Sequence, residues 1–126
     1  MWEALSRHAK LALLFFLPYS QRKAIDRRLR GREEFRKLHR ADWLLVSWGK
    51  SGRTWLRVML SRLYQVKHGL SQRYLLGFDN FHSMNRAIPK IFLTHDNYIK
   101  DYTGNVDNKS DFYGHKVVLL ARDPRD

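Results

Sequence analysis

The stretch Trp43-Leu44-Leu45-Val46-Ser47-Trp48-Gly49-Lys50-Ser51-Gly52-Arg53-Thr54-Trp55-Leu56 decides the fold of this chain. Residues 42–48 are nearly all apolar, which predicts a strand buried on both faces, as in a parallel sheet. A tight glycine turn with Lys, Ser and Thr follows, and from Thr54 the pattern is helical. Such a turn offers backbone N–H groups, a helix N-terminus and a cation to one anionic group. The stretch therefore predicts a site for phosphate or a close relative of phosphate.

The helix after the turn is predicted to have one apolar face, because its apolar residues recur at steps of three and four. That face consists of Leu56, Met59, Leu60, Leu63 and Tyr64. The basic residues are expected to lie largely off it: Arg53, Arg57, Arg62 and Lys67. Gly69 is expected to cap the helix C-terminus, and the polar residues 70–88 predict a loop with a short helix.

Two further apolar runs predict two more buried strands. Ile91–Thr94 ends at His95, and Lys116–Ala121 ends at Arg122, with a loop predicted over residues 96–114. One strand, a helix and two more strands with long crossovers predict an α/β domain with a parallel sheet and flanking helices. Ligands of such sheets bind at the carboxyl ends of the strands. Because Lys50, His95 and Arg122 each follow a strand, we expect them to share one site.

The composition limits the possible partners. At 126 residues with 44% hydrophobic residues, the chain suits one folded domain. Its formal net charge of +12 favours anionic partners such as nucleotides, nucleic acid, acidic glycans or an anionic membrane. The absence of cysteine excludes disulfides and thiolate metal sites. No His, Asp or Glu cluster has metal-ligand spacing, so we expect no metal.

Residues 1–40 form a basic segment that is predicted to be a partly helical lead-in, with a break at Gly31, to a domain over residues 41–126. Leu11–Leu17 (LALLFFL) is too short to span a membrane, and no small-residue cleavage site follows it. The expected structure is a short helix that packs its apolar side on the domain. An amphipathic anchor on a membrane surface stays open. The expected location is cytoplasmic, with attachment to a membrane surface as the alternative.

The last four residues, Asp123-Pro124-Arg125-Asp126, have the sequence of a helix start, a capping residue followed by Pro. The printed chain stops before that helix. We therefore expect an N-terminal part of a larger domain, whose fold is incomplete at the C-terminus.

Three segments, taken together, resemble the sulfotransferase family. Gly49-Lys50-Ser51-Gly52-Arg53-Thr54-Trp55 resembles the P-K-S-G-T-T-W turn that holds the 5′-phosphosulfate of 3′-phosphoadenosine 5′-phosphosulfate in that family. Pro89–His95 is similar to the strand that ends in the catalytic histidine, and Lys116–Asp126 to the segment whose arginine binds the 3′-phosphate. The resemblance covers about residues 42–126 and implies a P-loop-like sulfotransferase fold.

The resemblance implies a role for each matching residue. Lys50 would stabilise charge on the leaving phosphate oxygen, and His95 would take a proton from a hydroxyl or amine acceptor. Backbone and side-chain groups of Ser51, Gly52, Arg53 and Thr54 would hold the 5′-phosphate, with Trp55 beside the adenine and Arg122 on the 3′-phosphate. The implied co-substrate is 3′-phosphoadenosine 5′-phosphosulfate, without a metal. The acceptor would be a small molecule, lipid or carbohydrate, and no nucleic acid is expected.

The chain departs from the family pattern at several positions, and two other functions stay open. Gly49 replaces a usual Pro, Arg53 a common Thr, and Leu93 a frequent Lys. A serine that the family places eight residues after the arginine lies beyond the printed sequence. One alternative is a P-loop kinase or NTPase, although Leu44 stands where the Walker A motif needs its first glycine. The other is a non-enzymatic, basic protein that binds a membrane surface or nucleic acid through residues 1–40.

Overall fold

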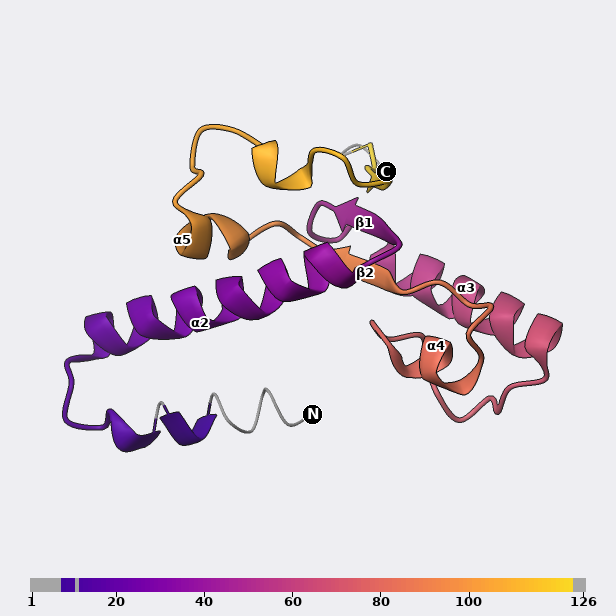
Figure 1. The fold of residues 1–126 in the computed structure, drawn as a ribbon, viewed down its shortest axis with the longest axis horizontal. Coiled ribbons are helices and arrows are strands. Elements are labelled where there is room, and N and C mark those ends of the chain that lie inside the picture. The colour runs from indigo at the N-terminus through magenta and orange to yellow at the C-terminus, as the bar shows by residue number, and fades with distance from the viewer. Residues whose placement is uncertain (1–7, 11, 124–126) are drawn as a thin grey trace. The chain divides into compact units, whose positions relative to one another are not determined.

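The structure is a computed structural model that describes residues 8–10 and 12–123. Its chain forms two compact units (Figure 1). One unit comprises residues 1–36 and 96–111, and the other comprises residues 37–95 and 112–126. The predicted division of the chain at residue 40 into a lead-in and a domain stays a prediction.

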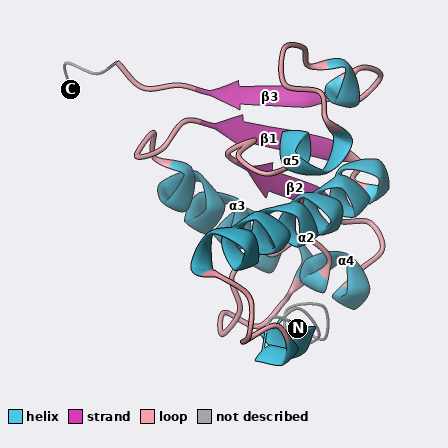
Figure 2. Cartoon of the chain, turned by 90° about the vertical axis from the view of Figure 1, so that its left-hand side faces the viewer, coloured by secondary structure: helices cyan, strands magenta, loops and turns pink. Residues whose placement is uncertain are grey.

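A three-stranded parallel sheet forms the centre of the unit over residues 37–95 and 112–126. Its strands are β1 (Trp43–Ser47), β2 (Ile91–Thr94) and β3 (Val117–Leu120), in the order β2-β1-β3. Val46 pairs with Thr94, and Ser47 with Leu120, so the three strands end at one edge of the sheet (Figure 2). With its helices, this sheet confirms the predicted α/β class and the three predicted strands.

The core of this unit lies beside the two strands that are well buried. Leu44, Leu45 and Ile91 are fully buried within β1 and β2. A cluster of Leu76, Phe81, Ile88 and Ile91 packs against half-buried apolar residues that include Leu60 and Tyr64. Phe81 belongs to α4 (Asn80–Met84), the short helix predicted within residues 70–88. Partial burial raises the pKa of the Tyr64 phenol, because its ionised form loses solvation.

The prediction that the third strand is buried is wrong. Val117 and Val118 are each nearly half exposed, and Leu119 is 73% exposed. Neighbouring residues of a strand point to opposite faces, so neither face of β3 is well covered by the described residues. Among the strands of the described residues, β3 is an outer strand and pairs only with β1. An apolar run thus predicted the strand correctly but not its burial.

The helix after the turn, α3, runs from Arg53 to His68. Gly69 ends it in the left-handed conformation, at φ 64°, and its N–H bonds to the Gln65 carbonyl, which confirms the predicted C-cap. The predicted apolar face is only partly buried, because Met59 and Leu63 are more than half exposed. The two buried residues of α3 are instead polar, Ser61 and Gln65.

The buried side of α3 is polar because it holds the backbone of the following loop. The Ser61 hydroxyl donates to the Arg57 carbonyl at 2.6 Å and accepts from the Leu76 N–H at 2.8 Å. Arg57 Nε donates to the Leu76 carbonyl, and Gln65 Nε2 to the Tyr74 carbonyl at 2.8 Å. Arg57, Ser61 and Gln65 are four residues apart and share one helix face. Arg57 therefore lies with Ser61 and Gln65 on the polar side of α3 that holds the loop.

The predicted break at Gly31 is wrong, because α2 runs without interruption from Tyr19 to Arg40. Gly31 is buried, and a Cβ atom there would lie 2.2 Å from the Tyr98 carbonyl oxygen and 2.9 Å from Tyr102 Cβ. Glycine therefore allows residues 98–102 to approach the helix backbone closely. Most of those residues belong to α5 (Ile99–Thr103), a short helix inside the predicted loop over residues 96–114. A 3₁₀ turn at Ser110–Phe112 lies in the same predicted loop.

The apolar segment before α2 does not pack as expected. Leu13, Phe15 and Phe16 are 73%, 77% and 69% exposed, so packing of this apolar side on a domain is wrong for these three side chains. Among the described residues, no helix combines the length and the apolar character that crossing a bilayer requires. The expected helix start at residues 123–126 lies almost entirely outside the described residues.

Candidate functional site

The turn between β1 and α3 has an unusual backbone. Lys50 has φ 60°, a left-handed conformation that is uncommon for a residue with a side chain, and Gly52 has φ 88°. Gly52 precedes α3 and provides no capping side chain, and the first turn of α3 holds no acidic residue. The first N–H groups of a helix have no partner within the helix. The start of α3 therefore carries backbone donors and the positive end of the helix dipole.

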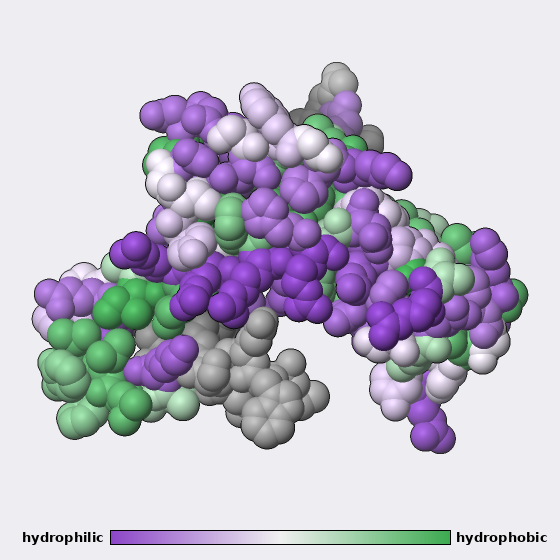
Figure 3. Space-filling view, in the orientation of Figure 1, coloured by the Kyte–Doolittle hydropathy of each residue, from purple (hydrophilic) through white to green (hydrophobic). Residues whose placement is uncertain are grey.

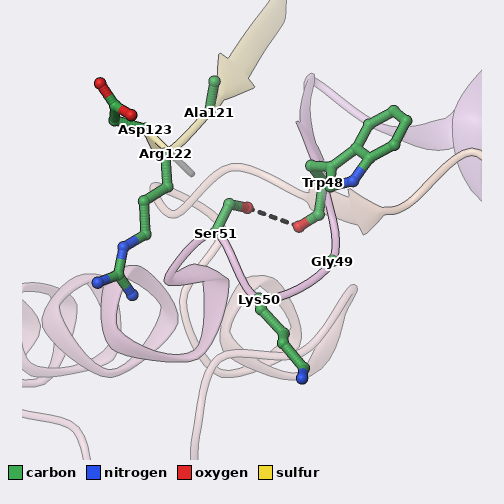
Figure 4. A pocket seen from close by; sticks show the side chains of 7 residues that line it. All are labelled: Trp48, Gly49, Lys50, Ser51, Ala121, Arg122 and Asp123. Carbon is green, nitrogen blue, oxygen red and sulfur yellow. Dashed lines mark hydrogen bonds between the residues drawn. The ribbon is translucent and has the colours of Figure 1, made fainter. Parts of the chain in front are cut away.

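Ser51 stabilises this turn from within. Its hydroxyl donates to the Trp48 carbonyl at 2.6 Å, and the residue is buried (Figure 4). With its proton used there, the hydroxyl keeps lone pairs but no donor for a ligand. The expected contact between the Ser51 hydroxyl and a phosphate stays a prediction, and it requires this bond to break.

His95 is held by the last residue of β1. Its Nδ1 lies 2.7 Å from the Ser47 carbonyl oxygen and 3.3 Å from the Ser47 hydroxyl oxygen. A carbonyl only accepts hydrogen bonds, so Nδ1 carries the proton. In the neutral ring, Nε2 then has the lone pair and can take a proton. Ser47 was not among the predicted site residues, although the parallel register places it beside the end of β2.

Most of the candidate residues line a single cavity of about 330 Å³. Its lining comes from the turn and first residues of α3, from the end of β2 and from the end of β3: Lys50, Gly52, Arg53, Thr54, Trp55, His95 and Arg122. The cavity volume lies in the usual range for small-molecule sites. Three of these side chains are cationic and none is acidic, which suits an anionic ligand. The expected association of Lys50, His95 and Arg122 is therefore present in the structure.

A second cavity of about 420 Å³ shares Lys50 and Arg122 with the first. Ser51 lines this second cavity, together with four residues that were not among the predicted site residues: Trp48, Gly49, Ala121 and Asp123. Figure 4 shows Lys50 and Arg122 extending from two different loops, while the Trp48 ring points away from both. Trp48 is 83% exposed, so it is a surface side chain and not the packing residue that an apolar strand suggests.

Neither metal ligands nor known relatives identify the site further. Over residues 8–10 and 12–123, no three His, Asp or Glu side chains are grouped closely enough to hold a metal ion. Comparison of the chain with protein-family models, curated proteins and solved structures gives no match. Only the geometry and chemistry of the residues themselves therefore bear on the function.

Proposed function

We propose that this chain belongs to a sulfotransferase and binds 3′-phosphoadenosine 5′-phosphosulfate for sulfuryl transfer to a hydroxyl or amine. One observation carries the proposal: the residues of all three sequence motifs line the same cavity. The second and third motifs begin about 40 and 70 residues after the first along the chain. The parallel register of the three strands brings the motifs to one edge of the sheet.

The electrostatics of the cavity support a donor with separated anionic groups. Lys50 and the N-terminus of α3 lie on the β1 side, whereas Arg122 comes from the end of β3. A cation and a helix N-terminus suit one phosphate, and a guanidinium from another loop suits a second. Trp55 is 75% exposed at the cavity and offers an indole face for an adenine.

The proposed reaction forms a bond between the acceptor oxygen or nitrogen and sulfur and breaks the bond from sulfur to the bridging oxygen. The electron pair of the broken bond stays on the bridging oxygen of the 5′-phosphate, where Lys50 offsets the developing charge. The acceptor proton passes to Nε2 of His95, the nitrogen that the Ser47 carbonyl leaves with a lone pair. No step requires a metal ion.

Calorimetric titration of the chain with 3′-phosphoadenosine 5′-phosphate tests the donor site, with ATP and magnesium as the comparison. Lys50→Ala and Arg122→Ala should each weaken bisphosphate binding about tenfold or more, since each removes a charge-assisted contact. Arg62→Ala and Lys67→Ala serve as matched controls, because both side chains are exposed on α3 and line neither cavity. Preferential binding of magnesium ATP would instead favour a kinase or NTPase. No bisphosphate binding by the folded chain would contradict the proposal.

A sulfuryl-transfer assay against a panel of phenol, amine, sugar and lipid acceptors tests the chemistry. His95→Ala should abolish most transfer while leaving bisphosphate affinity within about threefold, since the base acts on the acceptor and not on the bisphosphate. Equal transfer by the wild type and by His95→Ala would exclude the proposed base.

A further inference from the structure

The chain segment before α2 exposes an unusually apolar surface. Leu13, Phe15, Phe16 and Tyr19 are each at least 69% exposed, and the rings of Phe15 and Phe16 lie 6.0 Å apart, edge to face. Figure 3 shows this surface as a green patch over the segment that leads into α2. Single exposed apolar residues are ordinary, but several neighbouring ones mark an interaction surface.

Pro18 joins this apolar patch directly to the basic start of α2. The N–H groups of Gln21 and Arg22 both lie 3.1 Å from the Pro18 carbonyl oxygen, so helical bonding begins immediately after the patch. Tyr19, Arg22 and Lys23 then line one shallow cavity of about 240 Å³ on the first turns of the helix, with Asp26. Cationic side chains thus border the aromatic ones within the same unit.

This segment holds many more basic residues than acidic ones. From Lys10 to Arg32 the sequence holds seven Lys or Arg residues and one acidic residue, Asp26. Within the unit, Arg27 pairs with Asp101 and Arg30 with Asp26. Lys10, Lys23 and Arg28 are exposed. A second copy of the chain would bring like charges together at this patch, whereas an anionic surface would complement them.

We infer that residues 13–23 form a membrane-docking surface that inserts Leu13, Phe15 and Phe16 into the interface of an anionic lipid bilayer. Phe and Leu side chains are typical of the apolar face of a segment that lies in the bilayer interface, and Tyr is enriched at the headgroup level. Lys23 and Arg22 would attract anionic headgroups there, and Tyr19 would place its ring at the boundary. An apolar patch rimmed by cations fits this occupant better than it fits nucleic acid, which would leave the Phe rings without an apolar environment. The inference does not rest on the proposed function.

Cosedimentation of the full chain with vesicles tests the surface. The probes are vesicles of phosphatidylcholine mixed with phosphatidylglycerol, and vesicles of phosphatidylcholine alone. We expect binding to the mixed vesicles that weakens with salt and is much weaker on the neutral ones. Phe15→Ser/Phe16→Ser should weaken binding to the mixed vesicles by about 10- to 100-fold, because two aromatic side chains no longer insert. Arg22→Gln/Lys23→Gln should weaken it by about tenfold.

Two matched variants separate docking from general adhesion. Tyr113→Ser removes an aromatic side chain of the other unit that is equally exposed, at 76%. Arg62→Gln/Lys67→Gln makes the same charge change on α3. Both should bind mixed vesicles within about threefold of the wild type, since neither lies in the docking surface. Equal losses in test and control variants, or no binding to mixed vesicles, would overturn the inference. So would self-association without vesicles that Phe15→Ser/Phe16→Ser abolishes, because the patch would then bind a second copy.

These measurements are independent of the donor site. Phe15 and Phe16 line neither cavity of the candidate site. Phe15→Ser/Phe16→Ser should therefore bind 3′-phosphoadenosine 5′-phosphate as the wild type does, whether or not the membrane inference holds.

Discussion

Lys50 combines a strained backbone with a position at both cavities of the candidate site. Its left-handed backbone, at φ 60°, is unfavourable for any residue with a Cβ atom. Glycine would adopt it readily, and the sequence has glycine on both sides, at positions 49 and 52. A residue held in a strained conformation at a cavity suggests that its side chain is needed there.

Lys50→Gly should therefore stabilise the fold and impair the site. We expect a gain of about 0.5–1 kcal/mol in the free energy of unfolding, because the relieved strain exceeds the added entropy of the unfolded chain. Bisphosphate affinity should fall at least as much as in Lys50→Ala. Denaturant unfolding and calorimetry measure the two effects. Arg62→Gly, within α3, is the control and should lose about 1 kcal/mol. A loss of stability in Lys50→Gly would show that its φ is not strained.

The predictions made for single residues include both the clearest success and the clearest failure. Lys50, His95 and Arg122 could be grouped from sequence because each follows an apolar strand, and parallel strands end at one edge. Gly31 was misinterpreted, because glycine in a helical pattern predicts a break when no neighbour is known. Glycine is needed at position 31 because the Tyr98 carbonyl lies very close to the helix backbone there. The two residues are more than 60 positions apart in the sequence, so no local pattern could predict this contact.

At the scale of elements, α3 differs most from its prediction. Periodicity correctly predicted a helix, and glycine its end, because both depend on local backbone preferences. The buried side could not be predicted, since it depends on which segment covers the helix. A loop covers it, and buried loop backbone needs hydrogen-bond partners. Arg57, Ser61 and Gln65 supply them, and so polar residues are buried while Met59 and Leu63 remain exposed.

This arrangement makes Ser61→Ala a sensitive test of the loop attachment. The substitution removes the acceptor for the buried Leu76 N–H, while alanine itself is favourable in a helix. The unsatisfied N–H dominates, so we expect a loss of about 1–3 kcal/mol in the free energy of unfolding. Arg62→Ala, next to it but exposed, should change stability by less than about 0.5 kcal/mol. Thermal and denaturant unfolding provide the measurement, and equal stability of the two variants would show that the loop does not depend on Ser61.

At the scale of the whole molecule, the effect of the net charge of +12 on anion binding has to be distinguished from the effect of the candidate site. A strongly cationic chain attracts any polyanion over long range. Screening limits this attraction to about 10 Å at about 0.1 M salt. Arg62 lies nine residues along α3 from Arg53, which is about 13 Å at 1.5 Å per residue, and Lys67 lies farther. A charge at either position should therefore affect anion binding only through the long-range electrostatic field of the molecule.

Two charge-matched double variants make this separation measurable. Arg62→Gln/Lys67→Gln and Lys50→Gln/Arg122→Gln lower the net charge equally. At about 0.1 M salt, we expect the first pair to weaken bisphosphate binding by less than about threefold, with the difference vanishing as salt rises. The second pair should weaken it by about 100-fold or more at every salt concentration, because it removes direct charge-assisted contacts. Calorimetry at low and high salt compares them. Equal weakening by both pairs would mean that the bisphosphate responds to the charge of the molecule and not to a site at the ends of the three strands.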